Sequence, residues 1–353
     1  MRMLPIFVLL SCAAPDSAEV TEPDFEFLKK PIRVADYPLS PLLEGSGRFW
    51  FGTVGSGVGL VENGELRYLH AEDGLLGDRN MGFHEAQDGA IWFTTAENQM
   101  GGRCAVVRMR GEEWEYFSLG PDGDEGAGGV LESPDGEIWV TATAGIFKFT
   151  GAGFERYPLP DAEAIAMEWT PHSGLIAGDG TRIWATADRG VYIDRGEQEL
   201  ERLTVADGLL TNNVQVLFED REGQTWFSCH AWHAPEATGG LCVWDGRDIQ
   251  TFPEIEGLHG NDIYSGTQTR DGAIWIGATG LGVYRYLNGN WELFNAFASK
   301  EGAMNPESFG MNDIVEDASG KLWFCFAGGL FVLKDGKFQH VSQADLPAEI
   351  ERR

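Results

Sequence analysis

The stretch Asp88-Gly89-Ala90-Ile91-Trp92-Phe93 joins a turn dipeptide to a short apolar run centred on tryptophan, and the same phrase returns along the chain. It reads Asp135-Gly136-Glu137-Ile138-Trp139-Val140 one unit later and Asp271-Gly272-Ala273-Ile274-Trp275-Ile276 further on. The tryptophans recur at steps of 42, 47, 45, 42, 49 and 48 residues, at Trp50, Trp92, Trp139, Trp184, Trp226, Trp275 and Trp323. Spacing of this kind indicates a repeat protein with seven units.

Each unit has room for four short strands. A segment such as 213–220 precedes the tryptophan run, an apolar run such as Gly282-Val283-Tyr284 follows it, and a second turn leads into a segment such as 290–294. Turn residues separate these segments, which predicts a four-stranded antiparallel meander. A period of about 40 to 50 residues with four strands is typical of a propeller blade. The sequence therefore predicts an all-β fold, a seven-bladed β-propeller of four-stranded antiparallel blades.

A ring of such units is one cooperative domain, although a length of 353 residues by itself suggests two. We expect a single propeller domain over residues 25–345 and a C-terminal tail over 346–353. All four strands of the last blade are expected to come from the C-terminal part of the chain. Residues 25–34 are expected either to add an edge strand that latches the ring or to lie across its side.

The first residues differ from the repeats. Residues 1–11 combine one arginine with a short apolar stretch, and Leu9-Leu10-Ser11-Cys12 resembles the lipobox of a bacterial lipoprotein signal. The resemblance implies cleavage before Cys12 and lipidation of its thiol. A misassigned start codon that truncates an ordinary secretory signal is the alternative. Residues 12–24 are small, acidic and proline-containing, which predicts a flexible tether.

Acidic residues outnumber basic ones by 55 to 26, which gives a formal charge of −29. Such a surface repels phosphate backbones and anionic lipids, so we expect no nucleic-acid partner and a membrane contact only through the N-terminal lipid. Some of the acids have a structural reason, because Asp-Gly suits tight turns. The remaining excess is typical of a soluble extracytoplasmic protein, in the periplasm or at the outer membrane, and we expect a monomer.

Four cysteines follow Cys12. Cys229 falls three residues after its repeat tryptophan and Cys242 follows Gly239-Gly240-Leu241, so both are expected on one hairpin of blade five. In an oxidising compartment the sequence predicts a disulfide between them, although sequence alone leaves their redox state open. Cys104 and Cys325 are expected to be buried small side chains.

The repeat sequence resembles that of a known family. The segment Ala206-Asp207-Gly208-Leu209-Leu210-Thr211-Asn212-Asn213, continued through Asp220 to Trp226, resembles the two-component regulator propeller repeat. The resemblance covers residues 36–341. It implies a propeller of the kind that forms the periplasmic ligand-binding region of hybrid sensor histidine kinases or occurs free-standing. Nothing after Val341 resembles a membrane helix or a kinase, so we expect no output domain.

Long insertions indicate where a ligand would bind. Loops from strand two to strand three, and from strand four to the next blade, open on the same rim of a propeller, where loop-borne recognition is expected. The insertion after Cys229 carries a tryptophan between two histidines, which is a common platform for a sugar or small ligand. The alternative is that the tryptophan packs over the blade edge and the histidines cap the loop. The candidate ligand-binding residues, with two further insertions included, are His230, Trp232, His233, Asn98, Phe297 and Asn305.

Other groups of polar residues give weaker indications of function. The two histidines and two thiols of blade five match zinc ligand types, but the spacing is not a standard one, and a disulfide would remove both thiolates. Residues 122–125 lack the length of a calcium loop, and we read them as a solvated acidic turn. Asn212 and Asn213 are expected to satisfy turn backbone groups, as are Asn261 and Asn312. No cofactor is predicted, and a divalent cation is left open.

Two function classes follow. The first is a lipid-anchored, sensor-like propeller that binds a small molecule, a glycan or a protein on its loop face. The second is an enzyme, because residues 88–102 are similar to the repeats of streptogramin lyase, a magnesium-dependent propeller. No ordered histidine and glutamate pattern on facing blades supplies its base and metal ligands, so no catalytic residue is identified. We expect the binding module, with a magnesium-dependent lyase or lactonase-type hydrolase as the alternative.

Overall fold

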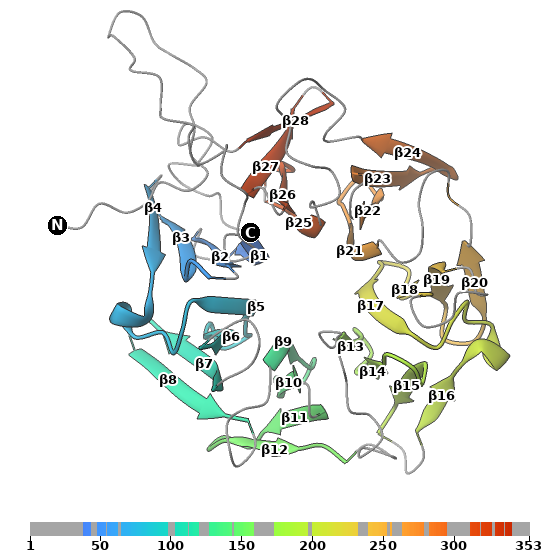
Figure 1. Cartoon of the computed structure of the whole chain (residues 1–353). Helices are drawn as coiled ribbons and strands as arrows, with labels where there is room; N and C mark the ends of the chain where they lie inside the picture. Colours follow the sequence, from blue (N-terminus) through green and yellow to red (C-terminus); the bar gives the residue numbers. More distant parts are fainter. Residues whose placement is uncertain are drawn as a thin grey trace, which may run out of the picture.

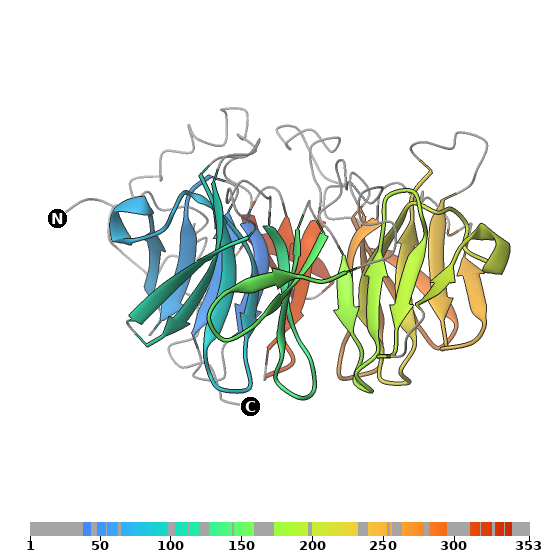
Figure 2. The same ribbon diagram turned by 90° about the horizontal axis from the view of Figure 1, so that it is seen from below.

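Seven four-stranded antiparallel sheets stand as blades around a common axis in the computed structural model (Figures 1 and 2). The prediction of a seven-bladed propeller is confirmed. No helix in the described part of the chain is long and apolar enough to cross a membrane. The structure describes residues 38–43, 48–53, 55–62, 65–97, 103–111, 113–119, 127–142, 145–158, 173–196, 200–231, 239–252, 255, 263–278, 282–294, 311–317, 319–326, 329–334 and 336–340.

The strands of each blade are consecutive in sequence, from the innermost to the outermost. Blade one is β1 (Pro38–Leu43), β2 (Phe49–Thr53), β3 (Val58–Glu62) and β4 (Glu65–Leu69), and blade two is β5 (Arg79–Glu85), β6 (Ile91–Ala96), β7 (Cys104–Arg110) and β8 (Glu113–Ser118). Blade three is β9 (Ala127–Glu132), β10 (Ile138–Ala142), β11 (Gly145–Phe149) and β12 (Phe154–Arg156), and blade four is β13 (Gly174–Ile176), β14 (Arg182–Ala185), β15 (Val191–Asp194) and β16 (Glu201–Leu203).

The last three blades follow the same order. Blade five is β17 (Val214–Glu219), β18 (Thr225–Cys229), β19 (Gly240–Trp244) and β20 (Ile249–Phe252), and blade six is β21 (Ile263–Gln268), β22 (Ile274–Ala278), β23 (Gly282–Leu287) and β24 (Asn290–Phe294). Blade seven is β25 (Met311–Glu316), β26 (Leu322–Phe326), β27 (Gly329–Lys334) and β28 (Lys337–His340). Two short 3-10 helices, η2 (Ala71–Asp73) and η3 (Val205–Asp207), precede blades two and five.

The ring closes between blades built from opposite ends of the chain. Blade seven takes all four strands from the C-terminal part, as the sequence predicts, and β1 of blade one lies against β25 and β26. Trp323 meets Phe49 across this junction, with ring centroids 5.2 Å apart. Aromatic packing therefore joins the two ends of the propeller. Residues 25–34, which the sequence offers as a latch, lie outside the described residues.

An aspartate placed just before the turn fixes the repeat tryptophan. Asp220 Oδ1 accepts the backbone N–H of Gln224 at 2.8 Å, while Oδ2 accepts Nε1 of Trp226 at 2.8 Å. Asp317 holds Trp323 in the same way, at 2.9 Å. One carboxylate thus satisfies both the turn backbone and a buried indole N–H, which explains the fixed distance from acid to tryptophan in these repeats.

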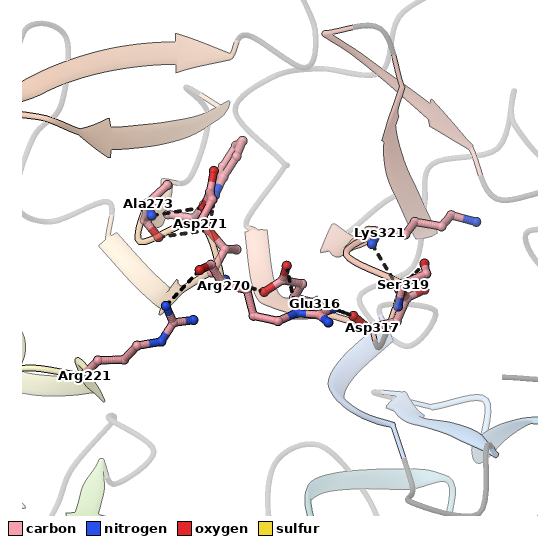
Figure 3. A network of polar contacts seen from close by, with 10 residues as sticks. Arg221, Arg270, Asp271, Ala273, Glu316, Asp317, Ser319 and Lys321 are labelled. Atoms are coloured by element: carbon pink, nitrogen blue, oxygen red, sulfur yellow. Dashed lines mark hydrogen bonds and ion pairs between the residues drawn. The ribbon is translucent and has the colours of Figure 1, made fainter. Parts of the chain in front are cut away.

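The turn between the first two strands is also tied to the next blade. The backbone N–H of Arg270 in blade six donates to Glu316 Oε2 of blade seven at 2.7 Å, and the Arg270 guanidinium pairs with the same carboxylate, with 3.3 Å between Nε and Oε1 (Figure 3). The same backbone bond joins three further pairs of blades, through Gln87 and Glu132, Gly178 and Glu219, and Arg221 and Gln268. We call this contact the blade clasp.

Blade four departs from the repeat by one position. Its turn contains the hydrogen bond from the Ala177 N–H to the Thr181 carbonyl, which has the same span as the bond from Ala86 to Ala90 in blade two. Counted from that turn, Ile183 takes the place of the repeat tryptophan and packs toward blade five, while Trp184 points to the opposite face. The expectation that Trp184 is equivalent to the other repeat tryptophans is therefore wrong by one residue.

Candidate functional site

The structure describes one of the six candidate ligand-binding residues. His230 directly follows β18 and is 1% exposed. The other five candidates, and the proposed lipidation site, lie outside the described residues: Trp232, His233, Asn98, Phe297, Asn305 and Cys12. His230 lies at the base of the blade-five insertion.

Two hydrogen bonds hold the backbone of His230. Its N–H donates to the Asn213 carbonyl at 2.8 Å, and the Thr211 hydroxyl donates to the His230 carbonyl at 2.9 Å. The imidazole Nε2 lies 3.4 Å from Ser228 Oγ, and the ring centroid lies 5.6 Å from that of Tyr264 on β21 of blade six. His230 thus belongs to the contact between two blades.

Asn213 completes this group from the start of β17. Its side chain is 6% exposed, and neither amide atom finds a hydrogen-bond partner among the described residues. The sequence assigned both Asn212 and Asn213 to the turn backbone. Asn212 does this, because its Oδ1 accepts the Val205 N–H at 3.0 Å, but the described part of the chain gives the Asn213 side chain no such role. We refer to Asn213, Ser228, His230 and Tyr264 as the rim cluster.

The rim cluster brings together an amide, a hydroxyl, an imidazole and a phenol. Three of its members come from blade five and one from blade six, at the ends of strands β17, β18 and β21. A buried amide that lacks hydrogen bonds costs about 1 to 3 kcal/mol, so native structures rarely keep one without a reason. The sequence pointed to His230, but only the fold shows that Asn213 lies beside it.

The two cysteines of the blade-five hairpin are in contact. Cys229 and Cys242 are free thiols, each 0% exposed, and their Sγ atoms lie 3.1 Å apart. The hydrogen bond from the Cys242 thiol, together with the backbone N–H groups of Thr211 and Leu210, lowers the pKa of Cys229 despite its burial. The same bond and burial raise the pKa of Cys242. The expected placement on one hairpin is therefore observed.

The remaining two described cysteines are buried, as the sequence predicts. Cys104 is 4% exposed and Cys325 is 0% exposed. Burial, and next the charge of Asp313 on the neighbouring strand β25, raise the pKa of Cys325. Burial also raises the pKa of Asp313 to about 7, although the Ile314 N–H donates to its carboxylate at 2.8 Å. Sequence patterns did not single out this inner-strand acid.

A cavity of about 200 Å³ lies between blades two and three, near their first turns. Trp92, Phe149 and Arg108 form much of its wall, and the Arg108 guanidinium lies 5.3 Å from the Trp92 ring centroid. The polar groups here have protein partners, since Arg108 bonds Glu115 at 2.6 Å and Glu132 accepts the Gln87 N–H at 3.1 Å. We interpret this cavity as part of the packing between the blades.

The described residues contain no group of three or more histidine, cysteine or acidic side chains placed to hold a metal ion. The acidic turn at 122–125 lies outside the described residues. A zinc site in blade five would need His233, which also lies outside the described residues.

No protein-family model and no curated relative matches this chain. Among solved structures it is similar to the extracellular domain of a hybrid two-component system protein of B. thetaiotaomicron, with 19% identity, a TM-score of 0.65, and coverage of 83% of this chain and 38% of that one. It is similar to streptogramin B lyase, with 16% identity, a TM-score of 0.64, and coverage of 84% and 93%. It also resembles PorZ, a surface component of the type-IX secretion system of Porphyromonas gingivalis, with 15% identity, a TM-score of 0.54, and coverage of 86% and 48%.

These likenesses show the fold. The chain spans well under two thirds of the length of the first of these neighbours. A propeller framework is common to the extracellular domain of a two-component system protein, a lyase and a secretion-system component, so function has to be argued from the site.

Proposed function

We propose that this protein is an extracytoplasmic, sensor-like propeller that binds a ligand at the rim of blades five and six. The rim cluster carries the proposal, and within it the buried amide of Asn213 is the decisive observation. A ligand that accepts a hydrogen bond from Nδ2 and donates one to Oδ1 would offset the cost of burying that amide. Ser228 and His230 lie on and directly after the adjacent strand, where both side chains are buried and contact each other at 3.4 Å.

The ligand class follows from these groups. An amide and a hydroxyl recognise neutral hydroxyl or carbonyl groups, and the Tyr264 ring offers a flat apolar surface beside them. A small molecule, a glycan or the loop of a partner protein would present such groups. The charge of −29 disfavours nucleic acids and other polyanions.

The cellular setting is proposed from the N-terminus and the surface charge. The lipobox-like Leu9-Leu10-Ser11-Cys12 supports cleavage and lipid attachment at Cys12, and the acidic composition is in keeping with a soluble domain outside the cytoplasm. The structural neighbours include extracellular domains of two-component systems.

Calorimetric titration against a panel of oligosaccharides and small metabolites, after a thermal-shift screen, tests the binding site. Asn213→Ala should abolish binding of whatever the wild type binds, while unfolding stability stays the same or rises, because the substitution removes an unsatisfied buried amide. The matched control is Asn80→Ala at the start of β5. Asn80 Nδ2 donates to the Gly77 carbonyl at 3.3 Å, while its buried Oδ1 finds no hydrogen-bond partner among the described residues, so the substitution should change stability little and leave binding unchanged. Equal affinity of the wild type and Asn213→Ala would reject the site.

The lyase alternative rests on coverage of nearly the whole streptogramin B lyase chain, 93%. It predicts turnover of a lactone or cyclic substrate that needs added magnesium. Liquid chromatography of a cyclic lactone panel, incubated with protein and with or without magnesium, measures this directly. Product formation would establish the enzyme in place of the binding module.

A further inference from the structure

Cys229 and Cys242 lie on the same face of neighbouring strands. In the register of β18 and β19, Cys229 is opposite Gly240 and Cys242 is opposite Phe227. The two cysteines are therefore diagonal neighbours with side chains on one face, packed in the apolar core between blades four and five. Their Sγ atoms are already 3.1 Å apart.

The sheet sets this geometry. Two adjacent antiparallel strands hold the cysteine backbones at a fixed spacing, so a bond between the sulfur atoms needs side-chain rotation and little backbone movement. Cys104 on β7 and Cys325 on β26 belong to two other blades. Among the cysteines that the structure describes, only this pair shares a sheet.

We propose that Cys229 and Cys242 form a disulfide when the chain folds outside the cytoplasm, which makes this pair a covalent modification site of blade five. The proposal is independent of the ligand proposed for the rim cluster. It requires a disulfide-bearing oxidant, such as oxidised glutathione or an oxidised thiol-exchange protein.

The chemistry is a two-step thiol exchange. The Cys229 thiolate attacks one sulfur of the oxidant disulfide, forms a mixed disulfide and releases one thiolate. The Cys242 thiolate then attacks the Cys229 sulfur, closes the protein disulfide and releases the second thiolate. The two cysteines lose two electrons and two protons, and the oxidant gains both as two thiols. The same exchange with the roles of Cys229 and Cys242 reversed gives the same disulfide.

Burial of the two cysteines determines when the disulfide can form during folding. Both side chains are 0% exposed and are covered by residues of blade four, so an oxidant reaches them before these blades pack. After packing, the same core shields the disulfide from external reductants. The bond would close the base of the hairpin that begins with His230 and ends at Gly239, so it would hold the end of β18 in place.

Refolding of the full chain from guanidinium, with reductant or with a mixture of reduced and oxidised glutathione, tests this proposal. Alkylation and peptide mapping should show a peptide linked through Cys229 and Cys242 after oxidative refolding, lighter than the reduced pair by two hydrogen atoms. The oxidised wild type should also melt several degrees higher than the reduced protein. Both cysteines recovered in alkylated form, or linked to other cysteines, would overturn the proposal.

Two variants separate the pair from other thiols. Cys229→Ala combined with Cys242→Ala should lose the redox-dependent melting shift, whereas Cys104→Ala combined with Cys325→Ala should retain it. If either variant fails to fold, the peptide map of the wild type still decides. Reduced folded protein should take up oxidised glutathione far more slowly than refolding protein does, and equal rates would contradict the timing set by burial.

Discussion

Trp139 and Trp184 meet across the junction of blades three and four, with ring centroids 5.9 Å apart and ring planes inclined by 40°. Trp139 points forward to the next blade, but Trp184 points back, because the repeat of blade four is displaced by one residue. Gly174 makes room for this reversal, since a Cβ there would lie 2.6 Å from the Trp184 ring. This junction therefore contains two tryptophan rings in a tilted contact, whereas Ile183 packs at the junction of blades four and five.

A double-mutant cycle measures the worth of this contact. Trp139→Leu and Trp184→Leu should each lower the unfolding free energy by about 2 to 4 kcal/mol, through lost apolar burial and a residual cavity. The double variant should lose about 1 kcal/mol less than the sum, because the ring contact is lost in either single variant. Urea unfolding followed by circular dichroism gives these values. Strict additivity would mean that the two rings do not interact.

Gly174→Ala tests the same junction from the other side. The added methyl group would overlap the Trp184 ring at 2.6 Å, so we expect a loss of about 1 to 3 kcal/mol in the same unfolding assay. Gly153→Ala is the control, since nothing lies within 4 Å of a Cβ at that glycine. In a Trp184→Leu background the cost of Gly174→Ala should shrink. If Gly174→Ala lowers the unfolding free energy equally in both backgrounds, the loss comes from the backbone and not from overlap with the Trp184 ring.

The fold was predictable because it depends on a pattern that survives local variation. Seven tryptophan phrases, each with turn residues on both sides, fix the number and order of strands whatever their exact bounds. The displacement in blade four is visible in the spacing, because Trp184 lies five residues after Asp179 whereas Trp92 lies four residues after Asp88. The turn hydrogen bonds and the packing show its consequence, which is that Arg182 and Trp184 face blade three while Ile183 faces blade five.

The site was predictable only in part. The insertion after Cys229 pointed to His230, and the repeat alignment placed Cys229 and Cys242 on one hairpin. The contact of His230 with Asn213 follows from the pairing of β17 with β18 inside blade five. The contact of His230 with Tyr264 depends on how blades five and six pack, which no local pattern encodes. A turn role was predicted for both asparagines, but in the described residues only the Asn212 side chain has it, and the Asn213 side chain finds no hydrogen-bond partner.

The pH dependence of stability should depend in part on Asp194. Burial raises the pKa of this carboxyl, but hydrogen bonds from Arg182, Tyr157 and the Gly196 N–H outweigh burial and leave the pKa below its usual range. The pKa is lower in the folded state than in the unfolded state, where it is about 3.9, so the stabilisation is present above about pH 4 and is lost as the pH falls further.

Asp194→Asn isolates that contribution. Asp194 is 1% exposed and binds Arg182 through both carboxylate oxygens, at 2.9 and 3.0 Å. The variant leaves the arginine without its charge partner and should lose about 2 to 3 kcal/mol at pH 7, the range for hydrogen bonds to charged groups. Its stability should fall less steeply than that of the wild type below pH 4. Parallel curves, from urea unfolding at a series of pH values, would show that Asp194 does not titrate as expected.

The blade clasp between blades six and seven separates into a backbone part and a charge part. Glu316→Ala removes the acceptor of the Arg270 N–H together with the ion pair, and should cost about 1 to 2 kcal/mol. Glu316→Gln keeps an acceptor oxygen and loses only the charge, so it should cost less than half as much. Arg270 is 53% exposed, which limits the worth of the ion pair itself. A larger loss of stability in Glu316→Gln than in Glu316→Ala would show that the charge contributes more than the backbone hydrogen bond.

Salt should stabilise the whole propeller. The chain has 55 acidic and 26 basic residues, so the folded state brings an excess of like charges onto one compact surface. Added salt shortens the screening length from about 10 Å at 0.1 M to about 3 Å at 1 M, which weakens repulsion between separate acids more than contacts between paired groups. The melting temperature should therefore rise by several degrees as sodium chloride increases over this range, and potassium chloride should act equally. A falling melting temperature would mean that exposed ion pairs, such as Arg110 with Asp88 and Arg195 with Glu201, stabilise the protein more than repulsion between the excess acids destabilises it.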